Sequence, residues 1–423
     1  MTMTATARDR IESWFRTGLE AVDPVSVTRE ALRELEPGEG KLIVLSIGKA
    51  AVAMATAAQE VLGDRIDSGL IVAKQGQVTE EVDRFTAIEA GHPIPDEQSL
   101  RAGETVLELV SNLSSNDTVI ALISGGGSAL LECPIEDISL MDMQVTTELL
   151  MYAGAGIYEL NTVRKALSAI KGGGLRRAIG DARCLTFMLS DVVGNDHTVI
   201  ASGPTIPGPS NRGQAWQVIE DFKIQQQIPE TVRLALTNDA PPWPDIDTSH
   251  DHRQVIADNT TLVTAVRNAA EQDGLRTIHV FRQWRDDAHD LAHRVLDDAR
   301  NVGEDIDLLI GGGEATSVVR GNGLGGRNTE MALVAALHLR PNEGWTIASL
   351  ASDGDDGNSG AAGAIIDAAT IDDKNIAEAA LRISDSAGYL QKRGALVVTG
   401  QTGTNVNDVY IAVRNSALSG ESP

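Results

Sequence analysis

The stretch between residues 306 and 330 constrains the fold of this chain most strongly. It begins with a short apolar run, Ile306–Ile310, which ends abruptly at Gly311, Gly312 and Gly313. An apolar run of this length bounded by glycine is typical of a strand that is buried on both faces. We therefore predict a buried strand followed by a tight glycine turn, whose backbone N–H groups are available to bind an anion.

A second glycine cluster, residues 321–326, leads to Arg327 and to a helix predicted over residues 331–339. An arginine among backbone donors at a helix N-terminus favours the binding of a phosphate or a carboxylate. The alternative is a flexible loop that ends in an ordinary surface arginine. The density of glycine around Glu314 and Arg327 favours the anion site, with residues 311–313 and Glu314 as candidate phosphate-binding residues.

The same plan occurs earlier in the chain, after an apolar strand predicted over residues 118–124. The strand leads into a glycine-rich turn and then into a short helix over residues 129–132. The turn consists of Gly125, Gly126, Gly127 and Ser128. We predict a second phosphate-binding turn here, because its N–H groups lie just before a helix start.

Lys49 lies between a strand predicted over residues 41–46 and an alanine-rich helix over residues 50–58. The Gly48-Lys49 turn is not a Walker A loop, because the earlier glycine and the Ser or Thr after the lysine are missing. A lysine at a helix start opposes the helix dipole unless an anion compensates it, so we predict that Lys49 contacts an anionic ligand. The alternative is a lysine whose stem covers apolar surface.

Arg164 and Lys171 belong to a basic cluster around the glycines at 172–174. Basic side chains beside glycines suggest contact with an anionic ligand, whereas a solvated helix face explains them equally well. We keep Arg164 as a candidate substrate-binding residue and Lys171 as a candidate phosphate-binding residue.

Two aspartates, Asp191 and Asp353, follow strands predicted over residues 184–189 and 345–351. The carboxyl ends of parallel strands are where α/β proteins bind ligands, so both are candidate Mg²⁺ ligands. Asp191 is also a candidate proton acceptor. In the alternative reading, each aspartate only caps a turn.

Strands and helices alternate along the 423 residues, which predicts an α/β fold with two or three domains. We place the domain boundary between residues 240 and 241, in an irregular proline-rich segment. The chain has no apolar stretch of about 18 residues and no apolar signal region at its start, so we predict a cytoplasmic protein without a membrane span. Its two cysteines, Cys133 and Cys184, are too few for a disulfide framework or a zinc site.

The formal net charge of −25 is spread along the whole chain. Such a charge disfavours nucleic acid as a partner, because phosphates require a basic face. It fits a halophilic protein, since high intracellular salt screens the self-repulsion. The charge therefore predicts an environment and does not identify a reaction.

Several sequence blocks, in this order, resemble those of the type II glycerate kinases, whose C-terminal part carries a MOFRL domain. The matching blocks cover residues 46–51 (SIGKAA), 91–97 (GHPIPDE), 122–131 (LISGGGSALL), 161–173 (NTVRKALSAIKGG), 189–205 (LSDVVGND with ASGPT), 311–317 (GGGEATS), 325–333 (GGRNTEMAL), 352–357 (SDGDDG) and 402–411 (TGTNVNDVYI). The resemblance extends from about residue 40 to about residue 413.

The resemblance implies an N-terminal Rossmann-like parallel-sheet domain, residues 1–240, and a smaller C-terminal α/β domain, residues 241–423, with the site in the cleft. It implies a kinase that uses ATP and Mg²⁺ to convert D-glycerate to 2-phosphoglycerate. In the family, the lysine and arginine that correspond to Lys49 and Arg327 are linked to activity. Asn328, in the same block as Arg327, is a further candidate for substrate binding.

Other readings remain open at this stage. Some family members carry the name hydroxypyruvate reductase, although no GxGxxG motif with a suitably placed acidic residue follows the early strands here. A sugar-phosphate-binding module without catalysis and a homodimeric assembly are further options. One departure from the family concerns Ala166, which replaces the usual histidine and puts any role of that histidine in doubt for this chain.

Overall fold

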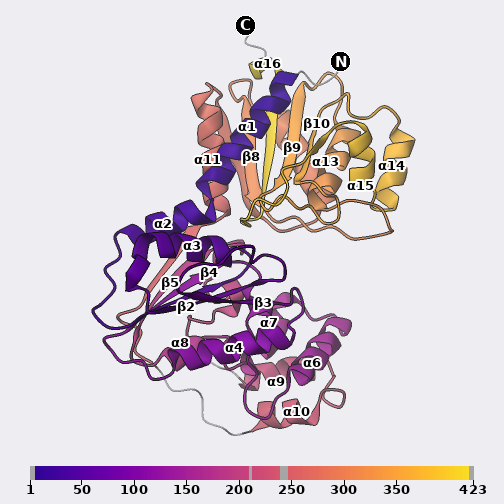
Figure 1. The fold of residues 1–423 in the computed structure, drawn as a ribbon. Helices are drawn as coiled ribbons and strands as arrows, with labels where there is room; N and C mark the ends of the chain where they lie inside the picture. The colour runs from indigo at the N-terminus through magenta and orange to yellow at the C-terminus, as the bar shows by residue number, and fades with distance from the viewer. Residues whose placement is uncertain (1–4, 209–211, 239–245, 419–423) are drawn as a thin grey trace. The chain divides into compact units, whose positions relative to one another are not determined.

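The computed structural model describes residues 5–208, 212–238 and 246–418. Contacts divide the chain into two units (Figure 1). Unit 1 comprises Met1–Asp23, Ser190–Gly194 and Ala257–Pro423, and unit 2 comprises Pro24–Leu189 and Asn195–Ile256. We describe each unit by itself.

The predicted boundary between residues 240 and 241 lies outside the described residues. The contact-based division instead falls after Ile256 and places the N-terminal helix with the C-terminal part of the chain. Helix α1 (Ala5–Ala21) packs along helix α11 (Asn259–Gln272), so closely that a Cβ on Gly18 would lie 2.5 Å from the Val266 side chain. The two units are therefore not consecutive halves of the chain.

Unit 2 is built on a six-stranded sheet with the order β3-β2-β1-β4-β5-β6 among the described residues. Its strands are β1 (Leu42–Ile47), β2 (Ser68–Lys74), β3 (Phe85–Ala90), β4 (Thr118–Ile123), β5 (Arg183–Leu189) and β6 (His252–Ala257). Strands β1 to β5 pair in parallel. The order is that of doubly wound α/β folds, in which ligands bind at the carboxyl ends of the strands.

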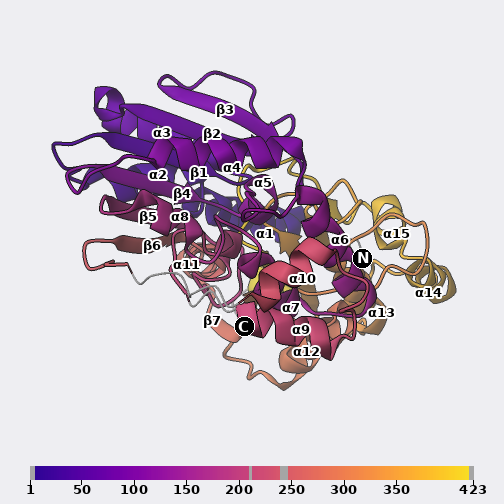
Figure 2. The ribbon, with the colours of Figure 1, turned by 90° about the horizontal axis from the view of Figure 1, so that it is seen from below.

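Helices cover both faces of this sheet, which explains why its strands read as continuous apolar runs. Alternate residues of β2 point to opposite faces: Leu70 and Val72 pack in the cluster that contains α4 (Glu97–Val110) and α8 (Gly174–Ile179). Figure 2 shows α4 lying along this face. Ile71 packs on the other side with α3 (Ala51–Leu62), against which α2 (Pro24–Arg33) lies.

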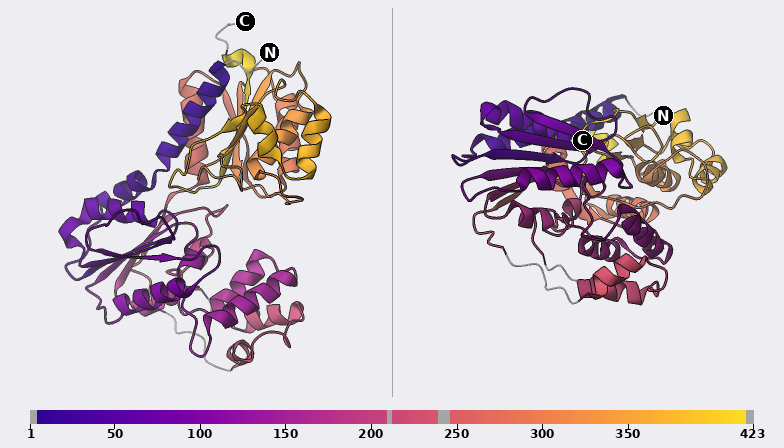
Figure 3. Two further views of the ribbon diagram at one scale, coloured as in Figure 1. Left: turned by 45° about the vertical axis from the view of Figure 1, so that its right-hand side comes forward. Right: turned by 60° about the horizontal axis from the view of Figure 1, so that its bottom comes forward.

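The remaining helices of unit 2 form a separate helical group with its own apolar core (Figure 3). The group consists of α6 (Leu140–Tyr152), α7 (Ile157–Ala166), α9 (Arg212–Asp221) and α10 (Glu230–Thr237). Ala166, at the family histidine position, is 4% exposed and belongs to this core. Short elements complete unit 2: η1 (Gly63–Arg65), α5 (Gly127–Leu130) and η2 (Ile200–Ser202).

Unit 1 is built on a second six-stranded sheet, with the order β11-β10-β9-β12-β8-β7 among the described residues. Its strands are β7 (Thr277–Trp284), β8 (Leu308–Gly313), β9 (Trp345–Ala351), β10 (Gly363–Ile366), β11 (Leu396–Val397) and β12 (Asp408–Arg414). Among the described residues, β7 and β8 pair in parallel, whereas β8–β12, β12–β9, β9–β10 and β10–β11 pair antiparallel. Strand β12, the last in sequence, therefore lies between β8 and β9.

One face of the second sheet is covered by four helices, whose apolar residues form the main core of unit 1. They are α12 (Ala288–Asn301), α13 (Arg327–His338), α14 (Lys374–Arg382) and α15 (Ser386–Lys392). Helix α11 packs against β7, β8 and β12, with α1 beside it (Figure 1). The short helix α16 (Asn415–Leu418) follows β12.

Within the described part of the chain, no helix combines the length and apolarity that a membrane crossing requires. Cys133 and Cys184 are both free thiols.

Candidate functional site

The predicted phosphate-binding turn of unit 2 has the expected backbone. Strand β4 ends at Ile123, and Gly126 adopts a left-handed conformation with φ of 84° before the short helix α5. The turn is tied to the neighbouring turn by a hydrogen bond of 2.9 Å from the Lys49 N–H to the Gly125 carbonyl. The turn that follows β1 and the turn that follows β4 are therefore hydrogen-bonded to each other at the carboxyl edge of the sheet.

Lys49 and His92 flank Gly126. A Cβ built on Gly126 would lie 3.2 Å from Lys49 Cγ and 3.2 Å from His92 Nε2, so a side chain at this position would crowd both residues. Burial, together with the charges of Lys49 and Lys74, lowers the pKa of His92, which keeps the imidazole neutral near pH 7. Lys49 lies two residues before α3, slightly outside the helix start expected from the sequence.

Arg164 holds the other end of the turn. From α7, its Nη2 donates to the Ser128 carbonyl at 3.0 Å, and the Ser128 hydroxyl lies 2.8 Å from the Ser202 hydroxyl. Burial lowers the pKa of Arg164, although the nearby charge of Glu132 opposes this effect. Arg164 is thus a largely enclosed cation beside a glycine turn.

Lys49 and Arg164 are both cations that lack a carboxylate partner among the described residues. Within residues 5–208, 212–238 and 246–418, neither has a carboxylate partner at ion-pair distance. A cation held beside backbone N–H donors without a carboxylate is the arrangement that binds a phosphate or carboxylate group. The Gly125–Ser128 turn with Lys49 and Arg164 is therefore the candidate anion site of unit 2.

Lys171 differs from its prediction as a phosphate-binding residue. Its Nζ donates to Glu132 Oε2 at 2.7 Å and to the Leu131 carbonyl at 3.1 Å, and both charged side chains are 1% exposed. Glu132 also accepts from the Ser168 hydroxyl at 2.6 Å. Lys171 therefore has an internal carboxylate as its partner, in place of the ligand that the sequence suggested.

In unit 1, Arg327 is the first residue of α13 and lies between two carboxylates. Its Nε and Nη2 donate to the two oxygens of Asp408 at 2.7 and 3.0 Å, while its Nη1 donates to Glu314 Oε1 at 3.0 Å. Burial opposes the charge of Arg327, but Asp408 and Glu314 outweigh it and raise the pKa of the guanidinium. Burial and the neighbouring charges of Asp408, Asp191 and Asp353 raise the pKa of Glu314, against the effect of Arg327.

The glycines 311–313 do not form the predicted turn. They are the last residues of β8 and pair with β12, so that Gly313 lies opposite Asp408. Their lack of a side chain serves close packing: a Cβ on Gly312 would lie 2.1 Å from Asn259 Oδ1, and one on Gly313 would lie 2.2 Å from the Trp284 nitrogen. The expectation of an open glycine turn at this position is therefore wrong.

The backbone N–H groups at the start of α13 are also hydrogen-bonded to a side chain of the protein itself. Asp356 accepts from the N–H groups of Asn328 and Thr329 at 2.9 and 2.8 Å, and burial raises its pKa to about 6. Asn328 is fully buried, and its Oδ1 accepts from the Ser349 hydroxyl at 2.6 Å. An internal carboxylate thus takes the donors that we expected to bind a ligand, and Asn328 is directed away from solvent.

Asp191 and Asp353, the candidate Mg²⁺ ligands, both act on Glu314 through their charge. Among the described residues, no group of three or more His, Cys, Asp or Glu side chains is placed to hold a metal ion. Mg²⁺ is commonly bound through one or two carboxylates together with substrate phosphates, a mode that Asp191 and Asp353 beside Glu314 can satisfy. The chemical type of these two side chains is therefore compatible with a magnesium ion.

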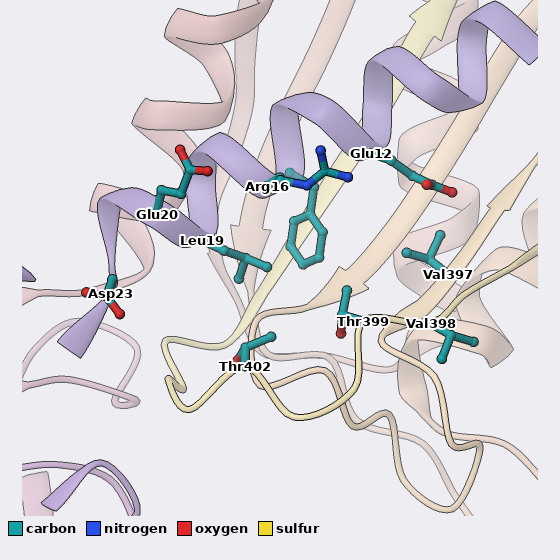
Figure 4. A pocket seen from close by; sticks show the side chains of 10 residues that line it. Glu12, Arg16, Leu19, Glu20, Asp23, Val397, Val398, Thr399 and Thr402 are labelled. Atoms are coloured by element: carbon teal, nitrogen blue, oxygen red, sulfur yellow. The ribbon is translucent and has the colours of Figure 1, made fainter. Parts of the chain in front are cut away.

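A cavity of about 530 Å³ lies elsewhere in unit 1, between α1 and the segment after β11 (Figure 4). Its lining residues are Glu12, Phe15, Arg16, Leu19, Glu20, Asp23, Val397, Val398, Thr399 and Thr402. No predicted site residue is among them.

Three carboxylates that pair with residues at these sites were not predicted from the sequence: Glu132, Asp356 and Asp408. Asp356 and Asp408 lie in the blocks SDGDDG and TGTNVNDVYI, which marked them as members of a pattern without showing their partners. Each pairs with a residue that is distant in sequence, as with Arg327 and Asp408, which are 81 residues apart. No spacing rule within one segment could have found these pairs.

A basic glycine turn at the carboxyl edge of a doubly wound sheet, and an arginine between carboxylates at the start of α13, give this α/β protein two candidate sites for small anions. The model of a domain of unknown function, DUF4147, matches residues 10–237, and the model of the MOFRL family matches residues 307–408. The chain belongs to the glycerate 2-kinase family that carries a C-terminal MOFRL domain.

Individual relatives are similar over nearly their whole length. A D-glycerate 2-kinase from Thermotoga maritima is 38% identical, over 94% of this chain and 96% of the relative. A protein from Agrobacterium vitis, provisionally assigned as a hydroxypyruvate reductase, is 35% identical, over 95% of this chain and 93% of the relative. The crystal structure of a glycerate kinase from Thermotoga maritima superimposes with a TM-score of 0.88 at 37% identity, covering 96% of this chain and 98% of that chain.

Proposed function

We propose that this protein is a kinase that transfers the terminal phosphoryl group of ATP to D-glycerate and forms 2-phosphoglycerate. One observation carries the geometric side of this proposal: Lys49 and Arg164, without carboxylate partners among the described residues, flank a glycine turn. Both reactants are anions, and phosphoryl transfer requires mainly positioning and neutralisation of negative charge. Similarity to a D-glycerate 2-kinase over 96% of its length supports the choice of substrate.

In this mechanism the turn formed by Gly125–Ser128 donates backbone N–H groups to an anionic group of the reactants. Lys49 and Arg164 supply two positive charges to the same group. In unit 1, Arg327 at the start of α13 carries a further positive charge, with its Nη1 edge directed at the partly exposed Glu314 carboxylate. These charges stabilise the transition state to the extent that they bind the transferring phosphoryl group more strongly than the ground state.

Asp191 is the proposed base for the attacking hydroxyl of glycerate. Its carboxylate follows β5, and its backbone is fixed by a hydrogen bond from Asn407. Magnesium, held by Asp191 and Asp353 together with the nucleotide, would neutralise phosphate charge. Asp191 cannot accept the proton and bind the metal ion in the same way, so its two candidate roles must be distinguished. The pH dependence and the Mg²⁺ dependence of the activity of Asp191 variants distinguish them.

Steady-state ATP consumption tests the proposal. We expect ADP release that depends on D-glycerate, Mg²⁺ and enzyme, and that vanishes when D-glycerate is omitted. ATP consumption at the same rate without D-glycerate would contradict the acceptor. The net charge of −25 further supports an assay at high potassium chloride, where repulsion between carboxylates is screened.

A further inference from the structure

Asp408 differs from the other carboxylate at Arg327. Its side chain has no solvent exposure, and both of its oxygens accept from the guanidinium, at 2.7 and 3.0 Å. A bidentate pair of this kind fixes the plane of the guanidinium as well as its position. Glu314, in contrast, accepts a single bond from Nη1, and its side chain is 44% exposed.

Tyr410 forms a hydrogen bond with Asp408 in addition to the ion pair with Arg327. Its hydroxyl donates to Asp408 Oδ2 at 3.1 Å and accepts from the N–H of Ala315 at 3.1 Å. Burial and the charge of Asp408 raise the pKa of Tyr410 well above its usual range, so the hydroxyl stays protonated and remains a donor. The hydroxyl thus joins β12 to the residue that follows Glu314.

We propose that Asp408, held by Tyr410, is a positioning residue that fixes the guanidinium of Arg327 and leaves its Nη1 edge to a reactant. The partly exposed Glu314 carboxylate occupies this edge in the structure, and a phosphate or carboxylate of the reactants takes its place during turnover. Asp408 itself touches no reactant. The inference rests on the proposed function, since it assigns a role to Arg327 in that reaction.

A double-mutant cycle separates positioning from general structural support. Asp408→Asn in the wild-type background is expected to lower kcat about 10- to 100-fold, because a misplaced charge costs on this scale. The KM for ATP stays within about twofold if the ground state is unaffected. In an Arg327→Lys background, where no bidentate pair forms, the same change costs less than about threefold. Equal losses in both backgrounds would overturn the proposal.

Tyr410→Phe tests the same proposal if the Asp408→Asn variant does not fold. It keeps the ion pair but removes the hydroxyl, and we expect a kcat about three- to tenfold lower. The matched control is Tyr389→Phe, which removes the hydroxyl of another buried tyrosine of unit 1, one that donates to Asp372 at 3.0 Å, and should leave kcat unchanged. Equal effects of the two tyrosine changes would contradict the proposal.

A spectroscopic measurement keeps the inference testable without turnover. In ¹⁵N NMR spectra, the Arg327 Nε–H should exchange slowly with solvent in the wild type and in Tyr389→Phe, and rapidly in Asp408→Asn. Unchanged protection in Asp408→Asn would contradict the positioning role. If the wild type shows these exchange rates and yet fails to phosphorylate D-glycerate, the proposed function is wrong. In that case the role of Asp408 in fixing the Arg327 guanidinium is still supported.

Discussion

The side-chain amide of Asn407 donates a hydrogen bond of 2.8 Å to the backbone carbonyl of Asp191. The next residue, Asp408, pairs with Arg327. One short segment at the start of β12 therefore contacts two predicted catalytic residues, which lie far apart from each other and from it in sequence. Asn407 itself adopts a left-handed conformation with φ of 65°, which asparagine tolerates better than most residues.

Replacing Lys49 tests the anion site of unit 2. Lys49→Met should lower kcat/KM roughly 100- to 1000-fold, because a charge that stabilises the transition state is lost. The melting temperature should hardly change, since the side chain has no carboxylate partner among the described residues. The matched control is Lys41→Met, a change of an exposed lysine just before β1, at the opposite edge of the sheet. Similar activity losses in both variants would argue against a site at Lys49.

The buried pair of Lys171 and Glu132 should behave as a structural element. Lys171→Met leaves the Glu132 carboxylate buried without its cation and should lower the free energy of unfolding by about 3–5 kcal/mol. The double variant Lys171→Met/Glu132→Leu should recover a large part of this loss, because no isolated charge remains. Chemical denaturation measures both. If Lys171→Met is fully stable but inactive, the ammonium serves a ligand after all.

Asp356 predicts a specific dependence of stability on pH. Burial raises its pKa from 3.8 to about 6 in the folded protein, so the native state binds this proton more tightly than the unfolded state. Its stabilising contribution is complete below pH 3.8 and is lost as the pH rises through 6, with a total change of roughly 3 kcal/mol.

Asp356→Asn removes this titration. The difference in unfolding free energy between wild type and variant should therefore shift in favour of the variant by roughly 2 kcal/mol between pH 4 and pH 7. Denaturant midpoints at several pH values measure the shift. A difference that stays constant with pH would show that Asp356 is ionised throughout and that its hydrogen bonds to α13 outweigh its burial.

Magnesium dependence should involve Asp191. Chelation of Mg²⁺ should abolish ATP consumption, and Asp191→Asn should raise the Mg²⁺ concentration for half-maximal activity about tenfold or more, as the loss of one ligand does. Asp355→Asn, a change of an exposed aspartate two residues after Asp353, is the control and should leave this concentration unchanged. An Asp191→Asn variant with a normal Mg²⁺ requirement but a lower kcat would assign Asp191 to proton transfer alone.

Sequence patterns were sufficient for the α/β class and for the strands buried on both faces. The run predicted over residues 345–351 matches β9, and the run over residues 118–124 nearly matches β4. Strands β3, β10 and β12 were not predicted. Strand β3 carries exposed residues at an edge of its sheet and β10 is four residues long, so neither shows a sustained apolar run. Strand β12 is buried and mostly apolar, but it was not recognised as a strand.

The candidate site was predictable where a single segment carries the signal. Lys49 and the Gly125–Ser128 turn follow strands directly, and the doubly wound order brings their ends together. The pairs that fix Arg327 and Lys171 were not predictable, because their carboxylates arrive from other segments. The glycines 311–313 were misread for a related reason: the close approach of Asn259 and Trp284 is a tertiary contact that leaves no local pattern.

The product of the reaction tests the central claim most directly. The purified protein is incubated with ATP, Mg²⁺, high potassium chloride and D-glycerate, and the products are resolved by ³¹P NMR. We predict that 2-phosphoglycerate and ADP accumulate in equal amounts. The absence of any phosphorylated glycerate, together with NADH-dependent loss of hydroxypyruvate, would contradict the kinase and identify a reductase instead.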